Sequence, residues 1–533
     1  MKQRILFLFL CVVTIAGYSQ FTIGPQKTIG GNSDDELGGI WLTTDGGLIA
    51  AGRSYSDISG DKTDYNRGID DYWVVKLSRT GNIQWQRTLG GSDIDECLAV
   101  QQTADGGYIL AGNSQSNISG EKTENSKGVF DCWVIKLDQH GNIQWQKTLG
   151  GDQYEFCNSV QQTTDGGYII GCMSNSNISG DKSENSRGGF DFWLIKLDGS
   201  GNKQWDKTLG GSGDEFVNDV IQTSDGGYIA VGLSNSNISG EKSENNRGAN
   251  DYWAVKLNKN GIKQWDKTAG GSADDYVNSV VQTADGGYAL FGASISNKSG
   301  DKTENIHGGF DYWLVKLSRN GAIQFNKTIG GLSDDYGQTI ENTMDGGVIL
   351  GGQSSSPISS DKDENSWGGF DYWLVKMNAN GTIAWNKDVG SDGDDNLRSV
   401  KEITKDKYII GGFTWGNIYG NKTDVSRGSN DFWIINLNYR NNFSDAENAP
   451  LNIATQTLKT DNTFSVFPNP AKNAVNIRSS TKANYTLIDQ FGKTLLSKQI
   501  DENGTIDVST YATGIYFIKN NLTGLSRRIL IVK

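Results

Sequence analysis

The heptapeptide Asp311-Tyr-Trp-Leu-Val-Lys-Leu317 opens with an Asp-x-Trp pattern that recurs every 60 residues along most of the chain. The seven occurrences are Asp71/Trp73, Asp131/Trp133, Asp191/Trp193, Asp251/Trp253, Asp311/Trp313, Asp371/Trp373 and Asp431/Trp433. A second marker, Asp-Gly-Gly, keeps step in the first six units, beginning at Asp45, Asp105, Asp165, Asp225, Asp285 and Asp345. The seventh unit has Lys405-Asp406-Lys407 at this place. A fixed period of this length indicates a repeat architecture.

Residues 268–327 show how one unit is expected to fold. The β-branched run 278–283 ends at Asp285-Gly-Gly287, a hairpin turn signal because Gly tolerates positive φ. The continuously apolar stretch 288–292 predicts a strand that is covered on both faces. After a polar stretch, the Asp-x-Trp heptapeptide predicts a third strand. The alternating residues 322–328 predict a half-exposed fourth strand, with Lys327 protecting its edge.

Four antiparallel strands repeated seven times predict an all-β, seven-bladed β-propeller. A parallel β-helix would need shorter coils, and an open array would need capping units that the sequence does not show. The seventh unit lacks a fourth strand. Residues 83–88 are the predicted fourth strand of the first unit, and residues 21–28 lie at the equivalent place one period earlier. We therefore expect the N-terminal strand to complete the last blade and to close the ring.

The Trp of each Asp-x-Trp is predicted to pack between blades. Each ring would bury about 150–250 Å², a gross gain of roughly 4–6 kcal/mol before entropy is counted. The alternative, a sugar-binding platform at every Trp, is a weaker interpretation. The Asp is expected to accept backbone N–H groups from the loop before the third strand. A second aromatic series is also interpreted as packing: Trp85, Trp145, Trp205, Trp265, Phe325 and Trp385.

The two ends of the chain differ from the repeats. Residues 1–20 combine Lys2 and Arg4 with a short apolar stretch, which predicts a cleaved secretory signal peptide rather than a membrane anchor. The propeller is expected to span residues 21–440. A polar, aperiodic linker follows at 441–463, and the short strands of 464–533 predict a small β-sandwich.

Charge is distributed unevenly. The formal net charge is −13, and loss of Lys2 and Arg4 with the leader takes it to −15. From Asn462 onward nine Lys and Arg stand against four Asp and Glu, so this tail carries +5 and the preceding body −20. An acidic body argues against nucleic acid as a partner and favours cations, basic partners or neutral sugars.

Four cysteines remain after leader removal: Cys97, Cys132, Cys157 and Cys172. In other units the equivalent places hold Leu or Val, Tyr or Phe, and Gly. They are interpreted as local replacements of packing residues rather than as a disulfide framework. An export compartment would permit bridges, but the sequence does not fix their geometry.

An acidic residue recurs at one offset after the Gly-Gly between units: Asp35, Asp95, Glu155, Glu215, Asp275, Asp335 and Asp395. If the ring closes, these carboxylates are predicted to converge on one rim of the channel, where a Ca²⁺ ion or a cationic group would relieve their repulsion. The favoured alternative is that each carboxylate caps its own loop. A second set in the long loops offers a less favoured Ca²⁺ hypothesis: Asp61, Glu121, Asp181, Glu241, Asp301 and Asp361, with Glu124 and its equivalents.

Catalytic motifs find little support. The two histidines, His140 and His307, do not recur between units, and no Gly-x-Ser-x-Gly elbow, P-loop or Cys/His metal spacing occurs. Glycoside hydrolysis stays open, because it needs only two carboxylates at a suitable separation. An active site would have to break the repeat pattern, and no unit does so conspicuously.

The tail closely resembles the C-terminal sorting domain of the type IX (Por) secretion system of Bacteroidota. The matching features are Phe467-Pro-Asn-Pro470, the Asp489 to Lys493 turn, Gly514-Ile-Tyr-Phe517 and the basic, apolar end. The resemblance implies that Pro468, Asn469, Pro470, Gly514, Tyr516 and Lys533 belong to the sorting signal. It also implies export through the outer membrane and removal of the tail by a processing peptidase. The repeats resemble kelch-type and other bacterial propeller repeats more loosely, which speaks to fold alone.

Together these features predict a secreted or surface-displayed propeller, on the outer membrane of a Gram-negative cell, that serves as a binding or scaffold module. The alternative is an extracellular glycan-binding or glycan-degrading protein that uses its acidic loop face. No cofactor is indicated with certainty, and Ca²⁺ is the one metal hypothesis. Expected partners are the secretion machinery and its peptidase, with no nucleic acid and no transmembrane segment.

Overall fold

The computed structural model describes residues 20–440 and 464–532, apart from 468–470, 480–481, 490–492, 502 and 523–525. The predicted signal peptide and linker therefore lie outside the described residues, except for Gln20. The chain divides into two compact units between Ser444 and Asp445. Every regular element in the described residues is a β-strand, so the predicted all-β class is confirmed.

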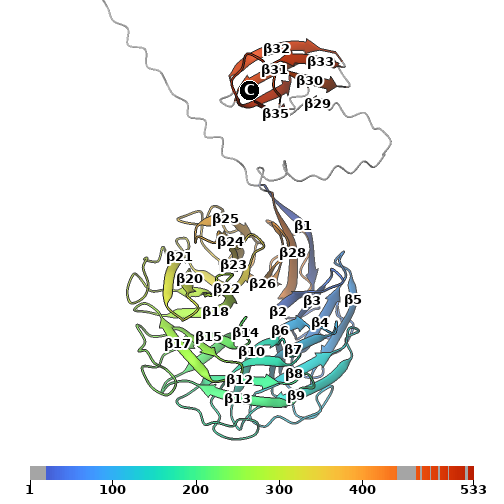
Figure 1. Cartoon of the computed structure of the whole chain (residues 1–533). Helices are drawn as coiled ribbons and strands as arrows, with labels where there is room; N and C mark the ends of the chain where they lie inside the picture. The colour runs from blue at the N-terminus through green and yellow to red at the C-terminus, as the bar shows by residue number, and fades with distance from the viewer. Residues whose placement is uncertain are drawn as a thin grey trace, which may run out of the picture. The chain divides into compact units, whose positions relative to one another are not determined.

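The first unit contains seven four-stranded antiparallel sheets, the blades, arranged around a central axis (Figure 1). Blade 1 comprises β2 (Asp35–Leu42), β3 (Leu48–Ser54), β4 (Asp71–Leu77) and β5 (Ile83–Leu89). Blade 2 comprises β6 (Asp95–Gln102), β7 (Tyr108–Ser114), β8 (Asp131–Leu137) and β9 (Ile143–Leu149). Blade 3 comprises β10 (Glu155–Gln162), β11 (Tyr168–Ser174), β12 (Asp191–Leu197) and β13 (Lys203–Leu209). Blade 4 comprises β14 (Glu215–Gln222), β15 (Tyr228–Ser234), β16 (Asp251–Leu257) and β17 (Lys263–Ala269).

The remaining blades continue the same order. Blade 5 comprises β18 (Asp275–Gln282), β19 (Tyr288–Ser294), β20 (Asp311–Leu317) and β21 (Ile323–Ile329). Blade 6 comprises β22 (Asp335–Asn342), β23 (Val348–Ser354), β24 (Asp371–Met377) and β25 (Ile383–Val389). Blade 7 comprises β26 (Asp395–Thr404), β27 (Lys407–Thr414), β28 (Asp431–Arg440) and β1 (Gln20–Ile29). The first strand of each blade lies innermost, around the axis (Figure 1).

The ring is closed by the N-terminal strand. β1 pairs antiparallel with β28, from Gln20 opposite Arg440 to Ile29 opposite Phe432. The start of the chain thus supplies the outermost strand of blade 7, which the seventh unit lacks. This pairing satisfies a strand edge that would otherwise be open. The predicted closure is confirmed.

The Asp-Gly-Gly turns join the first and second strands. In blade 5, Gly286 has φ +80°, and the Asp285 carboxylate accepts the Thr283 hydroxyl at 2.6 Å and the Gly287 N–H at 3.0 Å. Lys316, from the third strand, pairs with the same carboxylate at 3.0 Å. In the seventh unit, Asp406 itself adopts positive φ, 61°. The carboxylate of each Asp-Gly-Gly turn thus holds its own hairpin and also pairs with the third strand.

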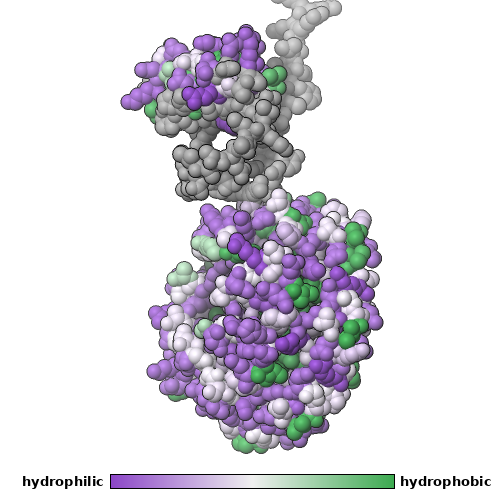
Figure 2. All heavy atoms as spheres, turned by 90° about the vertical axis from the view of Figure 1, so that its right-hand side faces the viewer, coloured by the Kyte–Doolittle hydropathy of each residue, from purple (hydrophilic) through white to green (hydrophobic). Residues whose placement is uncertain are grey.

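The hydrophobic core is divided among the interfaces between blades. Seven buried clusters lie in the described part of this unit, and each combines residues of two adjacent blades. The Trp of every Asp-x-Trp is fully buried. Tyr72, for example, packs against Trp133 with ring centroids 4.9 Å apart and donates its hydroxyl to the Trp133 carbonyl at 2.9 Å. The predicted packing of Trp between blades is confirmed, and the face in Figure 2 is accordingly mostly hydrophilic.

The second unit is a small two-sheet structure. One sheet has the order β29 (Phe464–Phe467), β30 (Ala474–Ser479), β33 (Asn503–Asp507). The other has the order β32 (Thr494–Ile500), β31 (Ala483–Asp489), β34 (Gly514–Asn520), β35 (Ser526–Ile531). Val475, Ile506, Leu487 and Ile518, from both sheets, share one buried core. The predicted β-sandwich is confirmed.

Candidate functional site: the central channel

The seven carboxylates predicted to form an acidic rim are buried instead. Asp35, Asp95, Glu155, Glu215, Asp275, Asp335 and Asp395 open the first strand of each blade and have no exposed surface. Asp35 accepts the Gly31 N–H at 2.6 Å and the Ser56 hydroxyl at 3.0 Å. Burial raises the pKa of Asp35, although these hydrogen bonds oppose the rise. These side chains point into their own blades and do not converge on the channel rim. They accept groups of their own loops, as in the favoured alternative. A ligand role for them stays a prediction.

Each blade also buries one lysine near these acids: Lys62, Lys122, Lys182, Lys242, Lys302, Lys362 and Lys422. Lys62 donates to the Ser54 hydroxyl at 2.7 Å and lies 5.9 Å from the centre of the Trp73 ring. Burial lowers the pKa of Lys62 to about 8, and burial raises the pKa of nearby Asp71 to about 7. As expected, Asp71 accepts a loop N–H, that of Arg67. Both side chains therefore bond within their own blade, although burial disfavours their charged forms.

A second Asp, which precedes the buried acid in five blades, joins neighbouring blades. Asp214 accepts the Phe190 N–H at 3.0 Å, and Asp334 accepts the Phe310 N–H at 2.9 Å. In each case the acceptor lies at the entry to one blade and the donor lies just before the third strand of the preceding blade. This contact holds the blade-to-blade loops in register around the channel.

The long-loop carboxylates form ion pairs. Glu121 pairs with Arg67 of the preceding blade at 2.7 Å, and Asp181 pairs with Lys127 at 2.7 Å. In the described residues, one group of three or more His, Cys, Asp or Glu brings its ligand atoms within 4.8 Å, and it consists of cysteines. The described carboxylates therefore form no comparable Ca²⁺ ligand group. Asp61, Glu121, Asp181, Glu241 and Asp301 each pair with an arginine or a lysine.

The channel is lined by the first strand of every blade. Side chains alternate along a strand, so Asp35 points into the blade while its neighbour Glu36 faces the channel. A bulge between Leu37 and Gly39 then interrupts this alternation, so that the consecutive residues Gly38 and Gly39 both face the axis. The channel holds two chambers. We call outer the chamber of about 370 Å³ lined near the start of the first strands, for example by Glu36 and Asn158, and inner the chamber of about 360 Å³ lined toward their ends, for example by Gln161 and Gln282.

The residues that face the channel differ in charge and polarity from blade to blade, whereas the core residues vary mainly among apolar side chains. The place of Glu36 holds, in order, Glu36, Glu96, Phe156, Phe216, Tyr276, Tyr336 and Asn396. The place of Gly38 holds Gly38, Leu98, Asn158, Asn218, Asn278, Gln338 and Arg398. The sevenfold repeat is therefore broken where a ligand would be contacted. Alignment of the seven units, position by position, would have revealed this from the sequence.

Half-exposed aromatic rings follow one another around the channel mouth, and we call them the aromatic arc. Its members are Phe130, Phe156, Phe190 and Phe216, then Tyr276, Phe310, Tyr336 and Phe370. Neighbouring ring centroids lie 5.2, 6.1 and 5.5 Å apart in the first group and 5.7, 5.1 and 5.7 Å apart in the second. Asn250 occupies the place between the groups. The arc offers a partly exposed apolar surface on blades 2 to 6.

Blades 1, 2 and 7 contribute charged residues to the same mouth. Arg53 pairs with Glu36 at 2.9 Å and also pairs with Glu96. Asp70 is buried beside them, and burial, with Glu96 as the next contribution, raises its pKa to about 7. Arg398 lies in the outer chamber with its guanidinium 5.2 Å from the centre of the Phe413 ring. The mouth is therefore aromatic on one side and ionic on the other.

The inner chamber contains a separate polar cluster. Lys401 pairs with Glu341 and lies 4.7 Å from the centre of the Trp41 ring. Burial within the channel lowers the pKa of Lys401 to about 8. Asp219 accepts the Ser159 hydroxyl at 2.9 Å and the Val280 N–H at 3.1 Å. Asp219 thus connects blades 3, 4 and 5, and Lys401 connects blades 6, 7 and 1.

The predicted sorting residues are only partly described. Pro468, Asn469, Pro470 and Lys533 lie outside the described residues. Gly514 opens β34 and pairs with Ile531, and Tyr516 donates its hydroxyl to the Ala512 carbonyl at 3.0 Å.

Residues 465–533 match the model of the secretion system C-terminal sorting domain. This match supports export by the type IX secretion system to the cell surface or the extracellular space. In the described part of the chain, no helix has the length and apolar character needed to cross a membrane.

Comparisons of the whole chain are more distant. The chain is 23% identical over 387 residues to the regulatory protein FlaEY of Caulobacter vibrioides, and this match covers 67% of this chain and 39% of that protein. Among solved structures, a protein of unknown function from Dyadobacter fermentans is 13% identical, with a TM-score of 0.41 over 79% of this chain and 99% of that chain. Sqt1 from Chaetomium thermophilum is 11% identical, with a TM-score of 0.41 over 79% of this chain and 100% of that chain. With TM-scores this low, these similarities carry no functional inference.

Proposed function

We propose that this protein is an extracellular binding module that holds its ligand at the channel mouth. The observation that carries the proposal is the asymmetry of the channel lining within a ring whose core repeats seven times. Residues needed only for folding can be the same in every blade. A single ligand that lies across the axis contacts each blade differently, so it favours different residues at equivalent places.

The chemistry of the mouth favours a neutral carbohydrate. Aromatic rings such as Tyr276 and Tyr336 offer flat apolar faces to the C–H faces of a sugar. The amides of Asn158 and Gln338, in the outer chamber, offer donors and acceptors to hydroxyl groups. The acidic body of the chain disfavours a polyanionic ligand.

Binding is favoured over hydrolysis at this mouth. Glu36 and Glu96 are both held in ion pairs with Arg53, so neither carboxylate is free to act on a bound sugar. Asp70 has a pKa raised to about 7, as a general acid requires, but its side chain has no exposed surface. Glycan degradation remains the second candidate, tested by adding a hydrolysis assay to any sugar that binds.

The tail supports a proposal about delivery. In this scheme a Bacteroidota cell exports the chain through an N-terminal signal peptide and the type IX machinery. A peptidase then removes the tail, and the propeller is displayed on the outer membrane or released. The secretion machinery is therefore a partner during export, and the ligand is the partner afterwards.

A glycan array with the secreted protein tests the binding proposal. The informative variant is Tyr276→Ala/Tyr336→Ala, and Phe325→Ala on the outer strand β21 is the matched control, since Phe325 is 36% exposed and far from the channel lining. Loss of about 0.5–1.5 kcal/mol per ring, or about 1–3 kcal/mol for both, corresponds to roughly 5- to 160-fold weaker binding of the double variant. Equal affinity of the variant and the wild type, or no sugar bound by either, would refute the carbohydrate proposal.

A further inference from the structure

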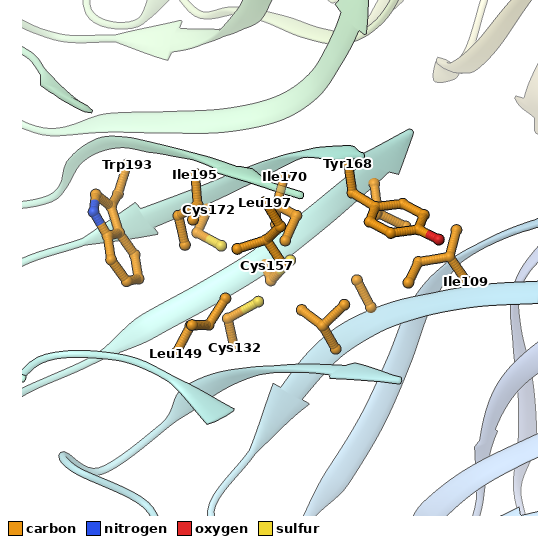
Figure 3. Close-up of a cluster of buried hydrophobic side chains, with 13 residues drawn as sticks. Ile109, Cys132, Leu149, Cys157, Tyr168, Ile170, Cys172, Trp193, Ile195 and Leu197 are labelled. Carbon is orange, nitrogen blue, oxygen red and sulfur yellow. The ribbon is translucent and has the colours of Figure 1, made fainter. Parts of the chain in front are cut away.

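Three buried thiols meet at the interface between blades 2 and 3. Cys132 comes from β8, Cys157 from β10 and Cys172 from β11, and their Sγ atoms all lie within 4.8 Å of one another. Figure 3 shows the three sulfur atoms turned toward one another among apolar side chains, including Leu149 and Ile195. The cysteines are unpaired in the structure, and none of the three has exposed surface.

Two of these cysteines break the repeat together. At the place of Cys132 every other blade has an aromatic residue: Tyr72, Phe192, Tyr252, Tyr312, Tyr372 and Phe432. At the place of Cys172 every other blade has glycine: Gly52, Gly112, Gly232, Gly292, Gly352 and Gly412. The two places face each other across an interface, because a Cβ built on Gly352 would lie 2.7 Å from the Tyr312 hydroxyl oxygen. A large-and-small pair has thus become a pair of cysteines.

This double replacement is unfavourable for packing alone. A Cβ built on Gly52 would lie 2.0 Å from the Glu36 carbonyl oxygen, so a side chain at this place forces the two strands to adjust. At the other place, Cys132 gives up both an aromatic ring and the hydroxyl bond that Tyr72 makes at its own interface. Two unfavourable changes on facing residues call for a compensating interaction.

The third cysteine has an ordinary explanation. Cys157 and Cys97 occupy the same place in their blades, where other blades have Leu37, Val217 or Val277. A buried thiol behaves there as a small apolar side chain. Cys97 does so without belonging to the cluster of three thiols. Cys132 and Cys172 are therefore the two cysteines that packing does not explain.

We propose that Cys132 and Cys172 form a disulfide bond that joins blade 2 to blade 3 in the exported protein. Formation of the S–S bond releases two protons and two electrons. The electrons pass to the disulfide of a thiol–disulfide oxidoreductase in the export compartment, which is reduced to a dithiol. Since both thiols are buried in the finished ring, the bond forms before this interface closes.

A metal–thiolate site is the competing explanation. Burial raises the pKa of the Cys132 and Cys172 thiols well above the ordinary value. Burial also opposes ionisation of Cys157, but hydrogen bonds from the other two thiols lower its pKa, so ionisation of all three thiols is costly. Three thiolates around one monovalent or divalent cation would leave a net negative charge among apolar side chains. A disulfide is neutral and avoids that cost.

Thiol mapping of the secreted protein tests the proposal. The protein is denatured without reductant in the presence of an alkylating agent, digested and analysed by mass spectrometry. The expected result is alkylation of Cys97 and Cys157 only, together with a peptide that links Cys132 to Cys172. Four alkylated thiols, with or without one equivalent of bound copper or zinc, would overturn it, as would a Cys157–Cys172 link.

Variants add a second readout. Cys157→Ser and the control Cys97→Ser are expected to retain the linked peptide. Reductant is expected to lower the Tm of the wild type and of Cys97→Ser by several degrees, because the open chain gains entropy. Cys172→Ser is expected to melt at one temperature with and without reductant. Equal sensitivity of Cys172→Ser and the wild type to reductant would overturn the proposal. If Cys172→Ser does not fold, the thiol mapping of the wild type decides whether the disulfide exists.

Discussion

Substitution of Ile29 by Ala tests whether the N-terminal strand holds the ring closed. Ile29 ends β1, is fully buried, and packs in the cluster between blades 7 and 1 with Leu37 and Trp73. Ile329 ends β21 at the equivalent place of blade 5, is also fully buried and is also isoleucine. Truncation of a buried isoleucine to Ala lowers the free energy of unfolding by about 2–5 kcal/mol, because apolar contacts are lost and a cavity remains. We therefore expect Ile29→Ala and Ile329→Ala to destabilise the protein equally.

Urea unfolding followed by tryptophan fluorescence measures the two effects, with the slope of the transition compared to confirm that the same surface unfolds. A loss of about 2–5 kcal/mol at Ile329 combined with less than about 0.5 kcal/mol at Ile29 would refute the reasoning. That outcome would mean that β1 contributes little to the ring. An equal loss at both places would mean that β1 stabilises blade 7 as strongly as β21 stabilises blade 5.

Further expectations concern the buried charges and the metal hypothesis. Burial raises the folded-state pKa of Asp71 and Asp191 to about 7, so the folded state binds these protons more tightly and the Tm is expected to fall from pH 5 to pH 8. A Tm that rises through this window would contradict it. EDTA is expected to leave the Tm unchanged, because in the described residues no group of three or more carboxylates brings its oxygens within 4.8 Å. A fall of several degrees, restored by Ca²⁺, would reverse that conclusion. Asp275→Asn is expected to lower stability by roughly 1–3 kcal/mol through its lost hydrogen bonds while ligand affinity is kept. Weaker binding at full stability would instead support a ligand role for the buried acids.

The sequence predicted the ring because its core places repeat. The Asp-x-Trp frame, the Asp-Gly-Gly turns and the missing fourth strand of the seventh unit each correspond to a feature of the structure. The tryptophans pack between blades, since a large apolar ring at one fixed place in every unit meets the same neighbours each time. Closure followed from the strand-like residues 21–28 at the opposite end of the chain.

The candidate site was missed for the same reason. Attention to what the seven units share selects residues such as Asp35, whose function is to fold the unit, and passes over Glu36 and Gly38. Spacing alone does not say which of two adjacent residues faces the channel, since strand neighbours point to opposite sides. The bulge at Gly38 and Gly39 shifts this alternation once more, and the local sequence of a single unit does not predict the bulge.

A crystal structure of the mature protein with the sugar that binds best on the array would test the proposed site most directly. Sugar rings are expected to lie at van der Waals distance, about 4 Å, from the aromatic arc, with hydroxyl groups reaching the amides of the outer chamber. A sugar seated on the long outer loops or at the Asp-Gly-Gly turns, with the mouth occupied only by water, would contradict the assignment.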